Sequence, residues 1–293
     1  MNLFLSPRDL GKAVGVSESS VKRWIDAGRL QAHRTAGGHR RVALSEAIRF
    51  IREAGLPLVH PELLGFRDLP SADAGALAVH RGEQLLRLLR EGESAEVCGL
   101  LLSWYLDGTR IAELADGPLC SSLSALGELW RHGDEGIVIE HRATDICLQA
   151  VTQLRLLLPA AGEEAPLAVG GSPDLDLFGS QLASAVIAEA GWRSINLGAQ
   201  TPPDILARAV EDLRPRLAWL SLTHLESADG LGSRIGCLLD VLDRTDGILI
   251  VGGRSRHRAG LPSHPRLHQG DSMADLAGFA SGLLRPALQS PSR

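Results

Sequence analysis

The chain has 293 residues, 44% of them hydrophobic and 22% charged, with a formal net charge of −5. This length predicts two or three domains, and the composition is ordinary for a soluble globular protein. No apolar run reaches the length of a membrane span and the N-terminus lacks a signal-peptide pattern, so we expect a cytoplasmic protein. The cysteines lie far apart without a C-x-x-C pair, so neither a zinc site nor a disulfide framework is expected at Cys98, Cys120, Cys147 and Cys237.

The charge is distributed unevenly along the chain. Residues 1–53 contain ten lysines and arginines against five acidic residues, so this segment carries +5 and the rest of the chain −10. A basic end on an acidic body is typical of a nucleic-acid-binding module joined to a sensor or assembly domain. The alternative, a small basic domain docked on an acidic one, leaves the basic hairpin described next without a role.

The first fifty residues predict a winged helix-turn-helix. A helix is expected from Ser6 to Val14, a turn at 15–17, a second helix from Ser17 to Gly28, and a basic hairpin over residues 30–42 with two glycines at its tip. Such a module places one helix in the major groove of DNA and its wing along the backbone or minor groove. The residues expected to contact operator DNA are Ser19, Ser20, Lys22, Arg23, Arg34, His39, Arg40 and Arg41.

Three domains are predicted, over residues 1–55, 70–160 and 165–288. Proline-marked segments at 56–61 and 68–72 separate the first module from a region in which leucines recur at helical spacing as far as residue 158. Four helices with short breaks in this region predict a four-helix bundle.

After residue 162, short apolar strands alternate with amphipathic helices. Strands are expected at 167–171, 195–198, 217–223 and 248–253, with helices at 181–190, 203–213, 233–244 and 273–284. This alternation predicts a doubly wound, parallel α/β sheet. Ligands bind such sheets at the carboxyl ends of the strands, where this chain places Asp174, Ser221, Thr223, Gly252 and Gly253. Taken singly, each of these residues also fits an ordinary strand-to-helix turn.

Together these features resemble a known family. The wing segment from Thr35 to Arg41 resembles the T-x-G-G-H-R motif of MerR-type regulators. Trp130, followed after nine residues by Glu140 and His141, resembles the W-x(9)-E-H signature of the cobalamin-binding photoreceptors of the CarH/LitR type. The α/β region is similar to the cobalamin-binding fold at its strand ends. The resemblance covers nearly the whole chain and implies an oligomeric DNA-binding regulator controlled by light or ligand.

One motif departs from the family's pattern. The family has D/E-x-H-x-x-G, whose histidine binds cobalt from the lower face of the corrin. This chain has Asp174-Leu175-Asp176-Leu177-Phe178-Gly179 instead. The spacing, the first acid and Gly179 match, but a carboxylate at Asp176 is a poor replacement for imidazole on cobalt. We therefore expect that Asp176 binds no metal.

On the upper face of the ring, the resemblance makes Trp130 a stacking plate, Glu140 a flanking acid and His141 a cobalt ligand after light removes the upper group. An aromatic plate and an imidazole suit a flat tetrapyrrole. The alternative is that Trp130 is a core aromatic of the bundle and His141 a surface histidine. The remaining histidines weighed here are expected to be polar loop residues and form no metal pattern: His132, His224, His257, His264 and His268.

Three functions remain open. The first is a regulator whose signal is a tetrapyrrole: cobalamin without the lower histidine, or another ring such as biliverdin or haem. The second is a ligand-independent regulator whose cobalamin-type domain serves homo-oligomerisation, as a dimer or tetramer, or binds a partner protein. The third, a corrinoid-dependent enzyme or carrier, is disfavoured because such proteins use the lower histidine and need no DNA module. We therefore predict a non-enzymatic transcription regulator that binds operator DNA and no membrane.

Overall fold

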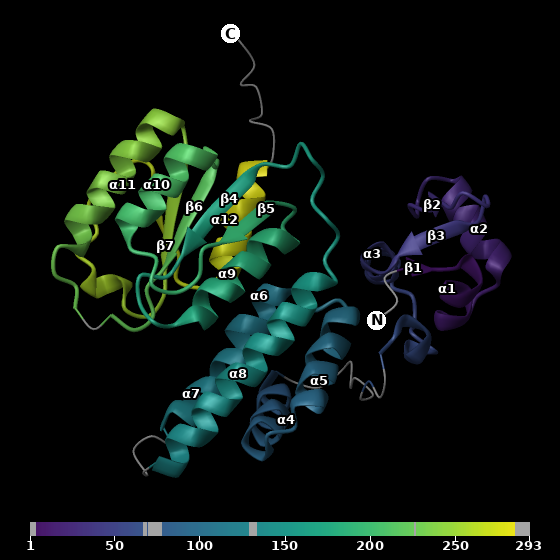
Figure 1. The fold of residues 1–293 in the computed structure, drawn as a ribbon. Helices are drawn as coiled ribbons and strands as arrows, with labels where there is room; N and C mark the ends of the chain where they lie inside the picture. Colours follow the sequence, from purple (N-terminus) through teal and green to yellow (C-terminus); the bar gives the residue numbers. More distant parts are fainter. Residues whose placement is uncertain (1–3, 67–68, 70–77, 129–133, 226, 285–293) are drawn as a thin grey trace, which may run out of the picture. The chain divides into compact units, whose positions relative to one another are not determined.

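The computed structural model describes residues 4–66, 69, 78–128, 134–225 and 227–284. The chain forms two compact units, residues 1–160 and residues 161–293 (Figure 1). The predicted fold class is confirmed, since a winged helix-turn-helix, a helical bundle and a parallel α/β domain follow one another along the chain. Among the described residues, no helix combines the length and the apolar character that a membrane crossing requires.

The N-terminal module combines three helices with a small antiparallel sheet. Its helices are α1 (Pro7–Ala13), α2 (Glu18–Asp26) and α3 (Leu44–Ala54); its strands, in the order β1-β3-β2, are β1 (Phe4–Leu5), β3 (Arg40–Ala43) and β2 (His33–Arg34). Two helices begin at serine caps, because the Ser6 hydroxyl accepts the N–H of Asp9 and the Ser17 hydroxyl that of Ser20. Their common core is built from Leu10, Val21, Leu30, Val42, Ile48 and Ile51.

Two elements of this module lie outside the sequence predictions, β1 and α3. Strand β1 has two residues and too short a pattern to be recognised. Helix α3 is amphipathic, buries Ile48 and Ile51, and ends at Gly55, whose φ of 58° lies in the left-handed region that glycine favours. It is followed by a short 3-10 turn, η1 (Pro61–Leu64).

The bundle contains the predicted helices, with the third one divided. Helices α4 (Ala78–Glu91), α5 (Ser94–Leu106), α7 (Cys120–Gly127) and α8 (Asp134–Leu156) are regular. Before α7, a single turn, α6 (Ile111–Leu114), runs into the π-helical turn η2 (Ala115–Leu119), where Pro118 has no N–H to donate. The 23 residues of α8 bury one face at helical spacing, through Ala143, Ile146, Cys147, Ala150 and Leu154.

The second unit is a five-stranded parallel sheet with helices on both faces. Its strands, in spatial order, are β5 (Arg193–Asn196), β4 (Leu167–Gly171), β6 (Leu217–Ser221), β7 (Ile248–Gly252) and β8 (Leu267–Gln269). Helices α10 (Pro203–Leu213) and α11 (Leu231–Thr245) cover one face, and α9 (Leu177–Glu189) and α12 (Met273–Leu284) the other (Figure 1). Every residue of the central strand β6 is buried, as a parallel sheet covered on both faces requires.

The strand order fixes where a ligand site is expected. Strand β4 lies between β5 and β6, so the connections that follow these strands diverge at the β4/β6 boundary. In an open α/β sheet this switch point, at the carboxyl ends of the strands, is where ligands bind. We call it the carboxyl edge. The structure departs from the predicted boundaries near it. Helix α9 begins at Leu177, four residues before the expected start at 181, β5 spans Arg193–Asn196 instead of 195–198, and β6 ends at Ser221 instead of 223.

Candidate functional sites

Helix α2 presents its polar side to solvent. Ser19, Lys22 and Arg23 are exposed, and Ser20 is half-buried. The Lys22 ammonium lies 2.7 Å from the carboxylate of Glu18, one turn earlier. The Arg23 side chain has no hydrogen bond or ion pair within the described part of the chain. Arg23 is therefore the cation of α2 that is most available to an external anion such as a DNA phosphate.

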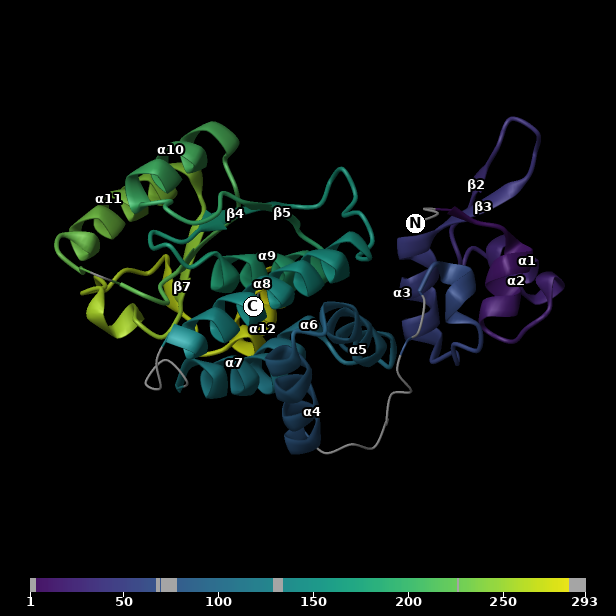
Figure 2. The ribbon, with the colours of Figure 1, turned by 60° about the horizontal axis from the view of Figure 1, so that its bottom comes forward.

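The wing is the β2–β3 hairpin, which extends beyond α1 and α2 (Figure 2). Its register places Arg34 opposite Arg40. The tip is closed by two backbone hydrogen bonds, from the Thr35 N–H to the His39 carbonyl at 2.9 Å and from the Gly38 N–H to the Thr35 carbonyl at 2.8 Å. Gly38 has a φ of 78°, a conformation that favours glycine. The exposed side chains of Arg34 and His39 are thus carried on an ordered tip.

Arg40 joins the wing to α2. Its Nη2 lies 2.6 Å from Oδ1 of Asp26, and its Nη1 donates to the Lys22 carbonyl at 3.4 Å. The Arg40 side chain is 22% exposed and half-buried between the two elements. Arg41, next in β3, is also half-buried, and its Nη1 donates to the Arg40 carbonyl at 3.5 Å. Of the two adjacent arginines, Arg40 therefore has its charge balanced inside the module.

An ion pair within α3 is hydrogen-bonded to the segment that follows α2. Arg49 donates to both oxygens of Glu46, at 2.7 and 2.6 Å, and the Glu46 carboxylate also accepts the Gln31 N–H at 2.8 Å. Burial alone would raise the pKa of the Glu46 carboxyl, but these hydrogen bonds and the charge of Arg49 outweigh burial and lower it. Glu46 therefore stabilises the base of the wing in its ionised form.

At the carboxyl edge, the carboxylate of Asp174 ties two loops together. Its Oδ2 accepts the N–H groups of Thr223 and His224, both at 3.0 Å, and its Oδ1 accepts the N–H of Asp176 at 2.9 Å. The buried Ser172 hydroxyl lies 2.7 Å from Oδ1. Asp174 therefore connects the loop after β4 to the loop after β6 and has no oxygen left without a donor.

Asp176, which stands where the resemblance places the lower cobalt ligand, is the N-cap of α9. Its Oδ1 accepts the N–H of Phe178 at 2.8 Å, and its backbone is extended, as an N-cap requires. The carboxylate satisfies a donor that would otherwise lack a partner at the start of the helix. The side chain present here fits helix capping and does not fit cobalt ligation.

Gly179 lies in the first turn of α9 and is closely approached by two hydroxyls. A Cβ placed on it would lie 2.6 Å from the Ser221 Oγ and 3.0 Å from the Thr223 Oγ1. These two oxygens are themselves 3.4 Å apart. The predicted residues Asp174, Gly179, Ser221 and Thr223 are thus brought together by the fold, and Gly179 is required by close packing.

The adjacent glycines after β7 have different roles. Gly253 has a φ of 100°, and a Cβ on it would lie 2.3 Å from the Leu222 carbonyl oxygen, so no other residue fits. Gly252 has a nearest neighbour at 3.7 Å and is not constrained in this way. The turn at Gly253 brings the Ser255 N–H to the Leu222 carbonyl at 2.9 Å and the Ser255 hydroxyl to the Thr223 carbonyl at 2.8 Å. A third loop thereby joins the edge.

Apolar side chains remain in solvent beside this hydrogen-bonded frame. Leu175 is 70% exposed, Leu177 38% and Leu197 37%. Leu177 also lies 3.8 Å from the position of a Cβ on Gly198, so the loops after β4 and β5 meet here. We call these three leucines the apolar rim. A cluster of exposed leucines at the ligand edge of a sheet is typical of a binding surface.

The remaining predicted residues belong to the other unit. Trp130, like His132, lies outside the described residues. Glu140 and His141 are on α8, where His141 has 68% of its side chain exposed and its Nε2 lies 3.7 Å from the Glu140 carboxylate. The Thr144 hydroxyl donates to Glu140 at 3.0 Å. These contacts also fit the surface-histidine alternative. Within the described ranges, no group of three or more metal-binding side chains occurs.

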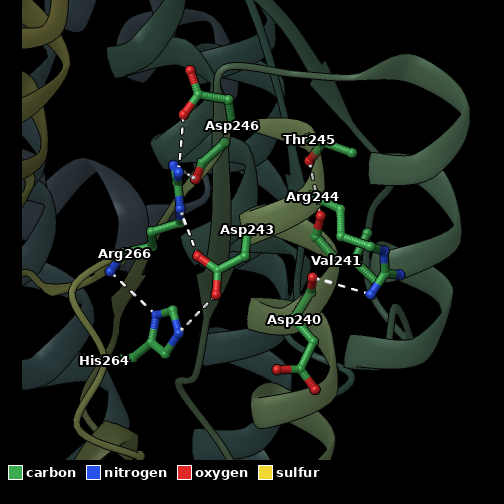
Figure 3. A network of polar contacts seen from close by, with 9 residues as sticks. Asp240, Val241, Asp243, Arg244, Thr245, Asp246, His264 and Arg266 are labelled. Atoms are coloured by element: carbon green, nitrogen blue, oxygen red, sulfur yellow. Dashed lines mark hydrogen bonds and ion pairs between the residues drawn. The ribbon is translucent and has the colours of Figure 1, made fainter.

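Figure 3 shows a polar network at the opposite end of the sheet, around Arg266 before β8. The Arg266 guanidinium donates to Asp243 at 2.7 Å and to Asp246 at 2.9 Å. His264 lies 3.2 Å from Asp243 through Nε2 and accepts the Arg266 N–H at Nδ1, also at 3.2 Å. His264 is therefore a loop residue, as expected, and helps to fix β8. The same expectation was wrong for His268, which lies in β8 and stacks on the Phe279 ring.

From the sequence, His224 was weighed at the ligand edge and assigned as a polar loop residue, and Arg254 was given no role. The His224 Nε2 lies 3.4 Å from the Arg254 Nη2, and both side chains are exposed. His224 follows Thr223 directly and Arg254 follows the glycine pair. The signal that identifies both is a position one residue beyond a predicted edge residue. Arg254 also begins a segment with four basic or histidine side chains between 254 and 258.

Comparison with known proteins supports both halves of this description. Residues 4–55 match the family model of a helix-turn-helix domain. No curated protein sequence matches the chain. The monomethylamine corrinoid protein of Methanosarcina barkeri has a similar structure, with a TM-score of 0.53 and 14% identity, covering 71% of this chain and 100% of that chain.

Two further structures match with TM-scores below 0.5. A cobalamin-binding protein from Desulfitobacterium hafniense has 18% identity and a TM-score of 0.35, covering 71% of this chain and 99% of its own. The methanol:cobalamin methyltransferase complex of Methanosarcina barkeri has 15% identity and a TM-score of 0.37, covering 77% and 89%. The likeness of fold rests on the monomethylamine corrinoid protein, with its TM-score of 0.53 at 14% identity. The chain therefore carries a helix-turn-helix domain together with an α/β domain that resembles cobalamin-binding folds.

Proposed function

We propose that this protein is a DNA-binding transcription regulator whose α/β domain binds a tetrapyrrole at the carboxyl edge without a metal ligand from Asp176. The single observation that carries the ligand half is the apolar rim of Leu175, Leu177 and Leu197, exposed at the carboxyl ends of β4 and β5. Exposed leucines favour a ring held by packing. Regulators of the MerR and CarH type, which the sequence resembles, combine the same domains.

The DNA half rests on the N-terminal module. The helix-turn-helix match covers the described module, and its α2 and wing present Lys22, Arg23, Arg34 and His39 to solvent. A basic recognition helix with a wing beside it suits binding to a DNA groove and its phosphates. Assembly as a dimer or tetramer, also part of the proposal, would strengthen binding because several modules engage one DNA at once.

Cobalamin held through the lower histidine does not fit this chain. The Asp176 carboxylate is occupied by the Phe178 N–H, and a carboxylate is a poor cobalt ligand. A corrin bound here would therefore receive no cobalt ligand from Asp176. A ring without cobalt, such as biliverdin, would need no such ligand.

A second candidate is a ligand-independent regulator whose α/β domain serves assembly or binds a partner protein. The observation that favours it is the close packing around Gly179, where the Ser221 and Thr223 hydroxyls occupy the space that a ligand tail would need. In that case the apolar rim would be covered by protein.

Two measurements on the purified full chain test the proposal. Absorbance titrations with cobalamin, biliverdin and haemin, in the dark and in light, are expected to show binding of at least one ring at micromolar concentration. Fluorescence anisotropy with a mixed-sequence DNA duplex is expected to show salt-dependent binding. DNA binding without any ring binding would favour the second candidate, and the absence of DNA binding would reject both.

A further inference from the structure

We infer that His224 and Arg254 form an oxyanion site at the carboxyl edge, and that it takes a carboxylate carried by the side chain of a ring ligand. The inference rests on the proposed function, because it assumes that a ring binds at this edge. It adds the chemical class of the ligand: a tetrapyrrole with free propionate side chains.

The two side chains are held side by side by a rigid backbone. The Asp174 carboxylate accepts the His224 N–H, and Ser255, the residue after Arg254, is hydrogen-bonded through its N–H and hydroxyl to the loop that carries His224. Gly253 fixes the turn that leads into Arg254. The frame of the edge therefore fixes the backbone from which both side chains start, and the Arg254 Nη2 lies 3.4 Å from the His224 Nε2. Little backbone entropy is left to lose on binding.

The charge of Arg254 is not balanced by its surroundings. Arg256 forms an ion pair with Asp271, and Arg258 donates to the Leu225 carbonyl at 2.9 Å, so these neighbours are engaged within the protein. Arg254 has no carboxylate partner among the residues that the structure describes, and its side chain is exposed. A cation beside an imidazole, without an acid, is a site for an external anion.

The geometry suits a carboxylate. An arginine fork donates two N–H groups to one carboxylate, and the N–H of an imidazole beside it adds a third donor. Corrin side chains end mainly in neutral amides, which gain little from such a pair, whereas porphyrin and bilin propionates are anionic. The apolar rim contacts a hydrophobic ring, so the edge offers complementary surfaces to a flat apolar body with acidic side chains.

Metal-free protoporphyrin IX and its dimethyl ester are the matched probes for this site. They share the ring and differ in the charge of the propionates, and without iron His224 cannot contribute as a metal ligand. Absorbance titrations of the full chain are expected to show tighter binding of the acid. Arg254→Gln and His224→Gln are expected to weaken binding of the acid, Arg254→Gln by about tenfold in Kd. Neither variant is expected to change the affinity for the ester.

The control variant is Arg244→Gln, which removes the same charge from an exposed arginine at the far end of α11. It should bind both probes as the parent does. Arg254→Lys, which keeps the charge but loses the fork, should recover part of the affinity for the acid. Circular dichroism of each variant confirms that the fold is intact.

The outcomes separate the inference from the proposed function. If neither probe nor any other ring binds the parent, both the oxyanion site and the ring-binding proposal are wrong. If acid and ester bind equally, and Arg254→Gln changes neither, the oxyanion site is wrong while the ring-binding proposal stands. A loss of cobalamin affinity in Arg254→Gln, with cobinamide and protoporphyrin unaffected, would assign the site to the phosphate of the cobalamin tail and overturn the carboxylate assignment.

Discussion

Arg40 in the wing and Asp26 at the end of α2 form an ion pair, with 2.6 Å between Nη2 and Oδ1. The contact joins the two elements that a winged helix-turn-helix uses to bind DNA. It also means that the cations of the module are not equivalent, because Arg40 is balanced by an acid while Arg23 has no such partner in the described structure.

The first prediction follows from that difference. Arg23→Gln should weaken DNA binding and reduce the slope of log K against log salt by about 0.9, the value for one lost phosphate contact. Arg40→Gln should weaken binding with a smaller change in slope, because its charge is already neutralised by Asp26. Anisotropy titrations over a range of salt concentrations measure both. Unchanged binding in both variants would place the DNA surface elsewhere.

The second prediction concerns the cap of α9. Asp176→Ala should destabilise the α/β domain by about 1 kcal/mol, the usual loss for an N-cap, whereas Asp176→Asn should be nearly neutral because asparagine also caps helices. Hydrogen exchange of peptides at the start of α9, measured by mass spectrometry, reports on this directly. Equal protection in Asp176→Ala and the parent would exclude the capping role.

A third prediction uses the same position in a different way. Asp176→His introduces the residue type that binds cobalt in the family the sequence resembles. With added cobalamin, its absorbance spectrum should shift toward histidine ligation from below, while the spectrum of the parent should not. A parent chain that already shows this ligation would contradict the proposal that the chain supplies no lower histidine. The substitution should also carry the stability loss of Asp176→Ala, because histidine is a weaker cap.

The fourth prediction tests the close packing under α9. Gly179→Ala would place a methyl group 2.6 Å from the Ser221 Oγ, so we expect a loss of about 1–3 kcal/mol in the free energy of unfolding. Combining it with Ser221→Ala removes the nearest atom and should recover part of the loss. Urea unfolding of the two single variants and the double variant gives the coupling energy. Additive effects would show that the two residues do not interact.

The fifth prediction concerns pH. Because the folded-state pKa of Glu46 is lowered, its contribution to stability is present above the ordinary glutamate value of 4.5 and is lost as the pH falls through the lower folded-state value. Glu46→Gln should therefore be less stable than the parent at neutral pH and should approach it in acid. Urea unfolding at both pH values checks this. A constant difference between the two chains would mean that ionisation of Glu46 plays no part.

The repeating patterns of the sequence were sufficient for most of the fold. Continuous apolar runs such as Leu217 to Leu222 identify buried parallel strands, and leucines at helical spacing identify the bundle. Strand β8 could not be found in this way, since Leu267 is the one apolar residue among its three and the strand is fixed by the Arg266 network. The predicted start of α9 at 181 was too late, because Leu177 and Phe178 were assigned to the preceding loop. The hydrogen bond from the Phe178 N–H to Asp176 places both residues in the first turn of the helix.

The sequence predicted which residues lie at the candidate site but not which hydrogen bonds they form. Asp174, Ser221 and Thr223 lie at or just beyond the ends of parallel strands. The α/β pattern therefore places them at one edge of the sheet. That Asp174 accepts N–H groups from a loop 49 and 50 residues away depends on backbone geometry and cannot be read from the sequence. The same holds for His224 and Arg254, whose proximity is set by the turn at Gly253.

The four donors on Asp174 have a kinetic consequence. A ligand could enter by opening the loops after β4 and β6 only if the hydrogen bonds from the Thr223 and His224 N–H groups to this carboxylate were broken together, which would make exchange slow. A fixed edge instead admits and releases a ligand through side-chain rotation at its rim. The backbone of the edge would then be the same with and without a ligand. Binding would change only the surface that the domain presents, with no folding transition at the edge.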